Sequence, residues 1–221
     1  MTAIPARHFD DVAQAERRDR ILDAAERCFV RSGFHRTTMQ DIASEAAMSP
    51  GNLYRYFPSK DAMVGGLAER DRAQMAHDFV LLAEAEDFSA TFVRMVRKHF
   101  LEEPREKAVL CLAIWSEATR NPEFAALSRD FDRDVLTRLT GLIERAKERG
   151  KVSASVEPQS VALLIATLAN GLFVRRAVAP DFHPEGEIGQ MLAVIEAAFA
   201  GRFDLPRIDP VGSEWNPESR S

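Results

Sequence analysis

The chain of 221 residues is 46% hydrophobic and 29% charged, a composition that is typical of a soluble globular protein and excludes disordered and fibrous classes. Its formal net charge of −5 argues against a protein that coats DNA non-specifically. The charge is unevenly spread, because residues 1–60 carry nine Lys/Arg and eight Asp/Glu, whereas residues 61–221 carry twenty and twenty-six. Any contact with DNA must therefore depend on a few well-placed side chains.

The cysteines and the apolar segments indicate the compartment. Cys28 and Cys111 each fall on an apolar helical stripe, so we expect two buried thiols in a reducing environment and no disulfide. The first fourteen residues lack the apolar core of a signal peptide. The longest apolar run, Val161 to Val174, is too short to span a bilayer. We expect a cytoplasmic protein.

The first sixty residues contain three predicted helices. Apolar residues at helical spacing predict a helix from Ala15 to Ser32, which Gly33 ends. A short second helix can be capped by Thr37 or Thr38, with Gln40 or Asp41 completing a capping box.

Ser49 caps the third helix, which has Pro50 at its first position and ends at Phe57 because Pro58 follows. A turn of about three residues joins the second and third helices. This is the helix-turn-helix pattern.

The remainder of the chain is predicted to be helical as well. Ser59 caps a helix from Lys60 to about Ala83, and no stretch alternates long enough to form a strand. We expect an all-α fold of about nine helices, divided into an N-terminal arm with the helix-turn-helix (1–60), a helical ligand-binding and dimerisation domain (61–200) and a flexible tail (201–221). The further helices are predicted at about Phe88 to Glu102, Arg105 to Arg120, Pro122 to Arg149, Pro158 to Ala179 and Glu185 to Ala200.

The third helix carries both tyrosines of the chain, within SPGNLYRYFPSK (49–60). With Leu53 pointing inward, Arg55 lies about 200° round the helix, on the outer side with Gly51 and Asn52. Arginine and asparagine side chains can read base edges, while tyrosine hydroxyls, a lysine and free backbone N–H groups can hold phosphates. The alternative is that Tyr54 and Tyr56 only edge the core of a small helical subdomain.

Residues Ile21 to Met63, ILDAAERCFVRSGFHRTTMQDIASEAAMSPGNLYRYFPSKDAM, resemble the N-terminal domain of the TetR family of bacterial transcriptional regulators. One residue departs from the family pattern: Ala47 stands where the turn usually carries glycine, and a left-handed backbone there would cost on the order of 1 kcal/mol. Either the turn adopts another conformation or it tolerates the strain. The resemblance implies DNA contacts at Thr38, Gln40, Ser49, Pro50, Gly51, Asn52, Tyr54, Arg55, Tyr56 and Lys60.

The resemblance also implies a second helical domain that encloses a small-molecule pocket and dimerises through its last two helices. The stretches Ile114–Leu127 and LLIATLANGLFVRRAV look like regulators of this kind. The segment from Val161 to Val174 is apolar almost all round, so it must be covered on more than its own domain's side. Two such helices from each of two chains could form a four-helix bundle, although they could instead cap the core of a monomer.

Two groups of residues are candidates for effector binding and its transmission. Adjacent glycines, Gly65 and Gly66, either soften the connector between the domains as a hinge or let another helix pack closely. Aromatic stripes are more often plain core than ligand box, and His99 on such a stripe is more often a satisfied core histidine. The pocket candidates are Phe92, Met95, His99, Phe100, Cys111 and Trp115.

The sequence contains no phosphate-binding glycine motif, no nucleophile elbow and no metal-ligand spacing, so we expect neither an enzyme nor a cofactor or metal. The interpretation is a homodimeric DNA-binding repressor that recognises a palindromic operator and is released by a small-molecule effector. The alternatives are a helical dimeric small-molecule carrier without DNA function and an enzyme whose site no motif marks.

Overall fold

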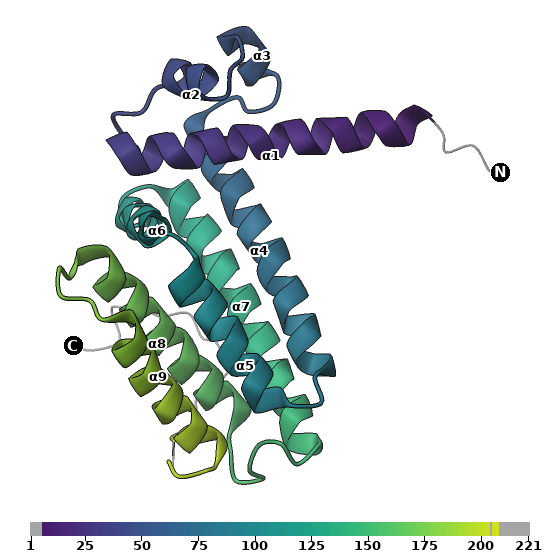
Figure 1. The fold of residues 1–221 in the computed structure, drawn as a ribbon, viewed down its shortest axis with the longest axis vertical. Helices are drawn as coiled ribbons and strands as arrows, with labels where there is room; N and C mark the ends of the chain where they lie inside the picture. Colours follow the sequence, from purple (N-terminus) through teal and green to yellow (C-terminus); the bar gives the residue numbers. More distant parts are fainter. Residues whose placement is uncertain (1–5, 204, 208–221) are drawn as a thin grey trace, which may run out of the picture.

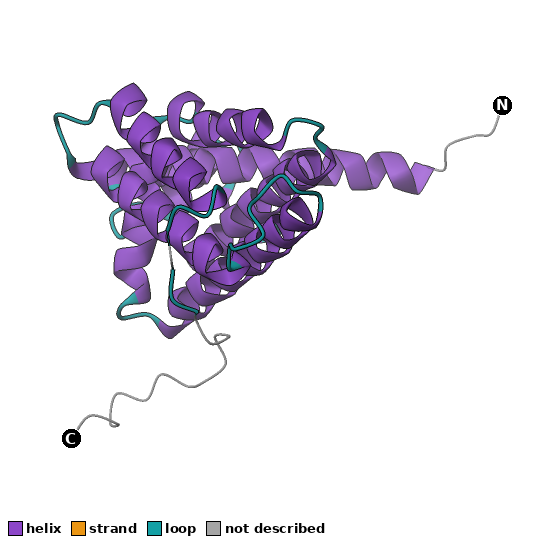
Figure 2. Cartoon of the chain, turned by 90° about the horizontal axis from the view of Figure 1, so that it is seen from below, coloured by secondary structure: helices purple, strands orange, loops and turns teal. Residues whose placement is uncertain are grey.

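The computed structural model describes residues 6–203 and 205–207, with side chains from residue 13 onward. Regular structure in this part of the chain is entirely helical, without a strand, as expected (Figure 2). Its helices are α1 (Ala6–Ser32), α2 (Met39–Glu45), α3 (Pro50–Tyr54), α4 (Lys60–Glu84), α5 (Phe88–Arg97), a π-helical turn η1 (Lys98–Glu102), α6 (Arg105–Ala118), α7 (Pro122–Glu148), α8 (Pro158–Val178) and α9 (Pro184–Phe199).

The helices form a small head on a larger body (Figure 1). Helix α1 lies across one end, with α2 and α3 on its outer side, and its N-terminal half projects beyond the body. Helix α4 descends from the head along one side of the body, while α8 and α9 lie on the opposite side. The body is therefore joined to the head by α4, and α2 and α3 are carried at the far end.

The helix-turn-helix is held by the caps that the sequence predicted, and the structure decides which threonine acts. Thr38 caps α2, since its hydroxyl oxygen accepts from Asp41 N at 3.1 Å while the Asp41 carboxylate accepts from Thr38 N at 2.8 Å. Thr37 is buried instead, and its hydroxyl lies within hydrogen-bond distance of the carbonyl oxygens of Cys28 and Gly33. One threonine therefore starts α2 and the other anchors the loop to α1.

Three helix boundaries differ from the sequence expectation. Helix α1 begins at Ala6, nine residues before Ala15, because no proline or glycine interrupts the intervening residues. Helix α3 ends at Tyr54, and its last carbonyl groups are taken up by turn hydrogen bonds such as that from Phe57 N to Leu53 O. The predicted helix over 88–102 ends in the π-helical turn η1.

The core consists of two clusters. The larger fills the body between α4, α5, α7, α8 and α9. The smaller fills the head, but it also contains Leu110 from α6 and Phe124 from α7. The head is thus packed directly onto the start of α7 and the middle of α6, in addition to its covalent link through α4.

Ala47, the residue that departs from the family pattern, has a left-handed backbone with φ of 53°. Its neighbour Ala46, the C-cap of α2, has φ of −81°. The chain keeps the left-handed turn and accepts the strain on an alanine there.

We predict that Ala47→Gly stabilises the protein, because the gain from relieved strain exceeds the entropic cost of a glycine by roughly 0.5–1 kcal/mol. Urea unfolding followed by circular dichroism measures the free energy. Ala46→Gly is the matched control and should lower stability, since its φ is already favourable for alanine. An Ala47→Gly protein no more stable than wild type would contradict the assignment of strain.

Candidate nucleic-acid interface and effector domain

The residues expected to contact DNA gather at one end of the molecule, on α2, α3 and the start of α4 (Figure 1). Asn52, Tyr56 and Lys60 are half-buried. The others are exposed: Thr38, Gln40, Ser49, Pro50, Gly51, Tyr54 and Arg55.

Helix α3 has a buried and an open side, as its sequence suggested. Leu53 is fully buried, whereas Arg55 is exposed and forms no side-chain hydrogen bond or ion pair with any described residue. A Cβ added at Gly51 would meet no atom within 4 Å, so the helix start is open to close approach. The tyrosines differ: Tyr54 is 52% exposed, while Tyr56 packs against the head core. The alternative that the tyrosines only edge the core therefore applies in part to Tyr56, whereas Tyr54 is exposed and available for contact with DNA.

Lys60 is engaged within the protein. Its ammonium donates to Phe34 O at 2.7 Å and lies 4.6 Å from the centroid of the Phe34 ring. The sequence placed Lys60 at the interface but did not indicate that Phe34 is its partner. The only sign of this role in the sequence is that Phe34 lies in the loop directly after Gly33.

The candidate effector-binding residues belong to separate parts of the body core. Phe92 packs with Phe88 and Phe199, at ring-centroid distances of 6.3 and 5.5 Å. Phe100 and Trp115 instead meet at Phe173, at 4.8 and 6.3 Å.

Two further candidates, Met95 and Cys111, differ in their surroundings, because only Met95 is packed against the body core while Cys111 lies on α6 near Asp71 of α4 and Glu26 of α1. Met95 packs against the core, and burial raises the pKa of the Cys111 thiol to about 12, so this cysteine is unreactive at neutral pH. Both cysteines are free thiols, as expected; Cys28 is buried, whereas Cys111 keeps part of its surface exposed.

Asp78 is a buried acid that sequence reasoning did not single out. It lies on α4, where His99 Nε2 is 3.1 Å and Lys98 Nζ 3.0 Å from its carboxylate oxygens, both residues coming from η1. Burial alone would raise the pKa of Asp78, but the hydrogen bond and charge of Lys98 lower it below its ordinary value. Burial lowers the pKa of His99 despite Asp78. His99 is thus a partnered core histidine, and the signal for Asp78 was an acid on the apolar stripe between Met75 and Phe79.

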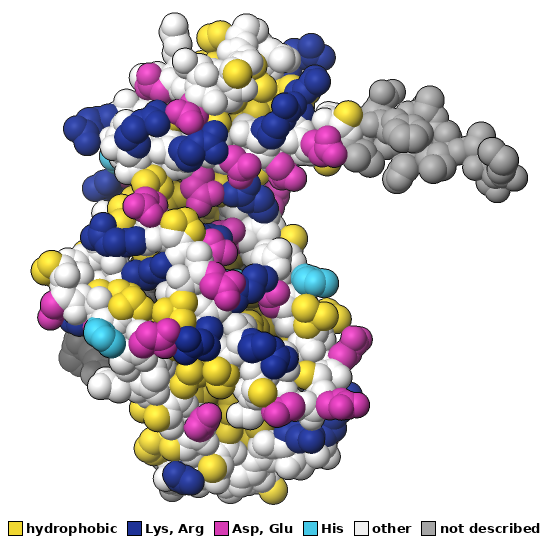
Figure 3. Space-filling model, in the orientation of Figure 1, with side chains coloured by type: hydrophobic (Ala, Val, Ile, Leu, Met, Phe, Trp, Pro, Cys, Tyr) yellow, Lys and Arg dark blue, Asp and Glu magenta, His cyan; other side chains and the backbone are white. Residues whose placement is uncertain are grey.

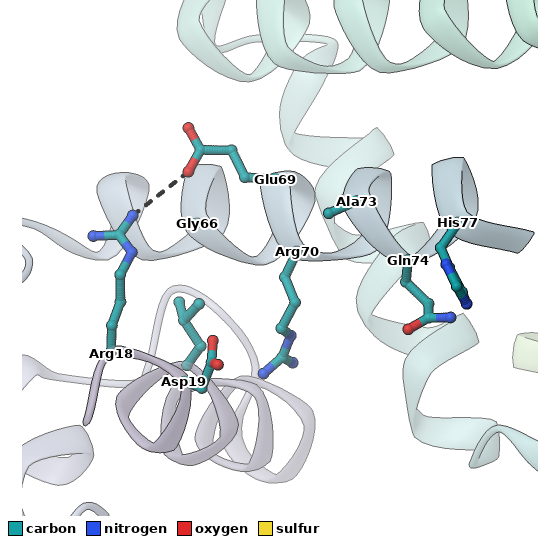
Figure 4. Close-up of a pocket in the computed structure, with 9 residues that line it drawn as sticks. Arg18, Asp19, Gly66, Glu69, Arg70, Ala73, Gln74 and His77 are labelled. Carbon is teal, nitrogen blue, oxygen red and sulfur yellow. Dashed lines mark ion pairs between the residues drawn. The ribbon is translucent and has the colours of Figure 1, made fainter. Parts of the chain in front are cut away.

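A hollow of about 510 Å³ lies between α1 and α4 (Figure 4). Arg18, Arg70 and Gln74 point into the space between the two helices. Its arginines are already paired, because Arg70 is bound to Asp23 and Glu26 at 2.6 and 2.7 Å, and Arg18 lies 3.5 Å from the Glu69 carboxylate (Figure 4). The hollow is therefore an open, internally neutralised groove.

The two hinge candidates have different surroundings. A Cβ at Gly66 would stand 3.0 Å from Leu22 Cδ2 and 3.0 Å from Phe57 Cε1, whereas a Cβ at Gly65 would meet nothing within 4 Å. Close packing of α1 and of the turn after α3 on α4 thus accounts for Gly66. Gly65 has no packing reason among the described residues, and the hinge hypothesis therefore depends on Gly65.

Gly65→Ala is expected to stabilise α4 by about 1 kcal/mol, since helix interiors favour alanine and the site has room. Gly66→Ala is expected to destabilise by roughly 1–3 kcal/mol through overpacking. Thermal unfolding measures both. The ratio of operator affinities with and without effector then tests the hinge in Gly65→Ala alone, because this variant leaves the packing intact; an unchanged ratio excludes a hinge at Gly65.

Helices α8 and α9 pack side by side, with Arg175 of α8 paired to Glu187 of α9 at 2.7 Å, and both helices expose apolar side chains or glycines to solvent. On α8, Leu163, Val174 and Val178 are 38%, 37% and 59% exposed, at positions that share one helical side with Gly171. No atom lies within 4 Å of a Cβ built at Gly171 or at Gly189 of α9. Nothing within the described chain explains either glycine. We call this surface the α8–α9 face.

Helix α8 spans 21 residues, so it is longer than the apolar run recognised in the sequence. By length and composition it could cross a membrane, and 33% of its most apolar window is buried within the described chain. The helix also packs against α6, α7 and α9, and Arg176 near its end is buried, with its guanidinium donating to Glu103 O. These contacts are those of a core helix with one uncovered side.

A helix-turn-helix with an open polar α3, carried on an all-helical body, defines a class of DNA-binding transcriptional regulators. Residues 21–67 match the bacterial regulatory proteins of the tetR family, and residues 89–202 match the C-terminal region of BetI-type transcriptional repressors. The chain therefore belongs to the TetR family, and it is a helix-turn-helix transcriptional regulator.

Individual relatives agree with this assignment. The regulator UidR of Escherichia coli K12 is 28% identical over 155 residues, which cover 70% of this chain and 79% of UidR. The structure of Salmonella enterica GusR has a TM-score of 0.69 at 25% identity and covers 83% of this chain and 95% of its own. A regulator from Saccharomonospora viridis in complex with choline has a TM-score of 0.68 at 26% identity, with 82% and 96% coverage.

Proposed function

We propose that the protein is a homodimeric repressor that places α3 of each protomer in a major groove of a palindromic operator. The observation that carries this proposal is the open side of α3, where Arg55 is exposed and unpaired among the described residues while Leu53 anchors the helix in the head core. Arg55 and Asn52 would read bases, and Ser49, Tyr54 and Lys60 would donate to phosphates. The remaining proposed contacts, Thr38, Gln40, Pro50, Gly51 and Tyr56, border the same surface.

The α8–α9 face is the proposed dimer interface. Its exposed valines and leucine favour burial, and Gly171 and Gly189 allow helices of a second copy to approach closely. A twofold axis through this face would form a four-helix bundle and pair two heads for two operator half-sites. A second copy that covers this face also explains why α8 is apolar on a side that the rest of the chain leaves exposed. For a DNA-binding regulator of this kind we propose a cytoplasmic location.

We propose further that a small molecule binds in the body core and releases the protein from DNA by favouring a non-binding arrangement. The residues proposed to contact it are Phe92, Met95, His99, Phe100, Cys111 and Trp115, and Phe173 joins two of them. The choline-bound relative supports small-molecule binding by a body of this kind. The function is regulatory, without a chemical step.

Genomic footprinting of the purified protein with and without cell extract tests the proposal. We expect protection of short palindromic sites, lost or changed when extract supplies the effector. Binding of the protected duplex should weaken linearly in a plot of log affinity against log salt concentration. A small-molecule carrier without DNA function would protect no site and would show no salt-dependent shift.

A further inference from the structure

The loop between α1 and α2 is a second place at which the body touches the head outside α4, in addition to the packing of Leu110 of α6 into the head core. The Phe34 ring packs against Phe124, near the start of α7, with centroids 5.3 Å apart and planes at 70°. In the same loop His35 Nε2 lies 2.8 Å from Glu117 Oε2 at the end of α6. Two adjacent loop residues therefore meet the corner between α6 and α7.

This corner is built firmly. Arg120 Nη2 donates to Glu117 Oε2 at 2.9 Å, and this hydrogen bond lowers the pKa of Glu117, so the carboxylate is ionised at neutral pH. Helices α6 and α7 both pack against α8, and Trp115 of α6 contacts Phe173 of α8. A change in the body core that moves α6 or α7 would therefore move the corner with them.

The same loop also holds Lys60. The Lys60 ammonium lies 2.7 Å from Phe34 O and 3.4 Å from His35 O, and it sits over the Phe34 ring. The two carbonyl oxygens take two of the three N–H groups of the ammonium, which leaves one to donate elsewhere. Its position is set by the loop as well as by α4.

We infer that Phe34 is a positioning residue for DNA binding, which holds the Lys60 ammonium ready for an operator phosphate and is itself held by Phe124 of the body. The inference rests on the proposed DNA-binding function and deepens it. It predicts that Phe124, which belongs to the body, affects operator affinity through Lys60.

A double-mutant cycle on the full-length protein tests this coupling. Lys60→Met keeps the aliphatic stem and should lower the salt slope of operator binding by about 0.9 per half-site. Phe124→Leu should weaken operator binding about 3- to 10-fold when Lys60 is present, and less than about 2-fold in the Lys60→Met background. Phe79→Leu, a buried phenylalanine of the body core, is the matched control and should have the same effect in both backgrounds.

The outcomes separate this inference from the proposed function. A wild-type protein without salt-dependent operator binding would overturn both. Wild-type binding with an unchanged salt slope in Lys60→Met would overturn the role of Lys60, and an equal effect of Phe124→Leu in both backgrounds would overturn the coupling. If Phe124→Leu does not fold, Glu117→Gln replaces it, because this substitution weakens the contact between Glu117 and His35 of the loop while keeping the shape of the side chain. The effect of Glu117→Gln on operator affinity should also require Lys60. An effect that is independent of Lys60 counts against the coupling.

Discussion

Arg55→Ala is expected to cause the largest loss of operator binding of any single substitution on α3. A bidentate arginine contact to a base contributes roughly 1–3 kcal/mol, and a dimer on a palindrome loses it twice, so affinity should fall by about 30-fold or more. The structure supports this choice because Arg55 has no partner among the described residues, so its removal costs the fold little. Fluorescence anisotropy with the footprinted duplex measures the change.

Arg133→Ala on α7 is the control for Arg55→Ala. Arg133 is also exposed, but it pairs with Asp130 at 3.1 Å and lies in the body. The Arg133→Ala substitution should leave both the operator affinity and its salt slope unchanged. Weakening of Arg55→Ala that is specific to one base position indicates base reading, whereas uniform weakening with a lower salt slope indicates a phosphate contact. Unchanged affinity would remove Arg55 from the interface.

Val174→Arg is expected to convert the proposed dimer to a monomer. The substitution places a long cation on the α8–α9 face, where burying it against a second copy would leave a charge unpaired. Because the two heads then no longer bind as one unit, operator affinity should fall by roughly 100-fold or more. Analytical ultracentrifugation measures the mass, and anisotropy measures the affinity.

Val80→Arg on α4 is the matched control for Val174→Arg. Val80 is 52% exposed, and its helix α4 lies on the opposite side of the body from α8 and α9 (Figure 1). The space-filling view shows hydrophobic side chains scattered over the lower body between charged ones, so exposure alone does not mark an interface (Figure 3). Val80→Arg should remain dimeric with wild-type operator affinity. A dimeric Val174→Arg protein would show that the protomers associate through another surface.

The helix-turn-helix was predictable because its signals are local. Ser49 and Ser59 set helix starts because their side chains accept a hydrogen bond from the backbone N–H three residues on, and Pro50 suits the first helical position through its fixed φ. The spacing of Leu53 from Arg55 decides which side chain faces out. The residue type at Ala47 left open whether the turn adopts another conformation or tolerates the strain, and the structure shows the left-handed backbone. The body helices were placed to within a few residues for the same reason, apart from the π-helical turn, which hydrophobic periodicity does not distinguish from an α-helix.

The contacts between distant segments were not predictable. Periodicity placed Phe100 and Trp115 on inward stripes, but their common partner Phe173 depends on how α6 and α8 cross. Gly66 was recognised as unusual, yet only the position of Leu22 and Phe57 separates a packing role from a hinge. The uncovered sides of Gly171 and Gly189 likewise appear only once the rest of the body is in place.

The sequence by itself determined an all-helical chain, a helix-turn-helix with an outward arginine, and two apolar C-terminal helices, because caps, turns and helical spacing act within a few residues. Tertiary structure alone decided that Lys60 is held by the loop at Phe34, and that Phe124, ninety residues further along the chain, packs against that same loop. Such contacts depend on how long helices pack, which is settled by the complementary shapes of surfaces far apart in the chain and leaves no local pattern to read.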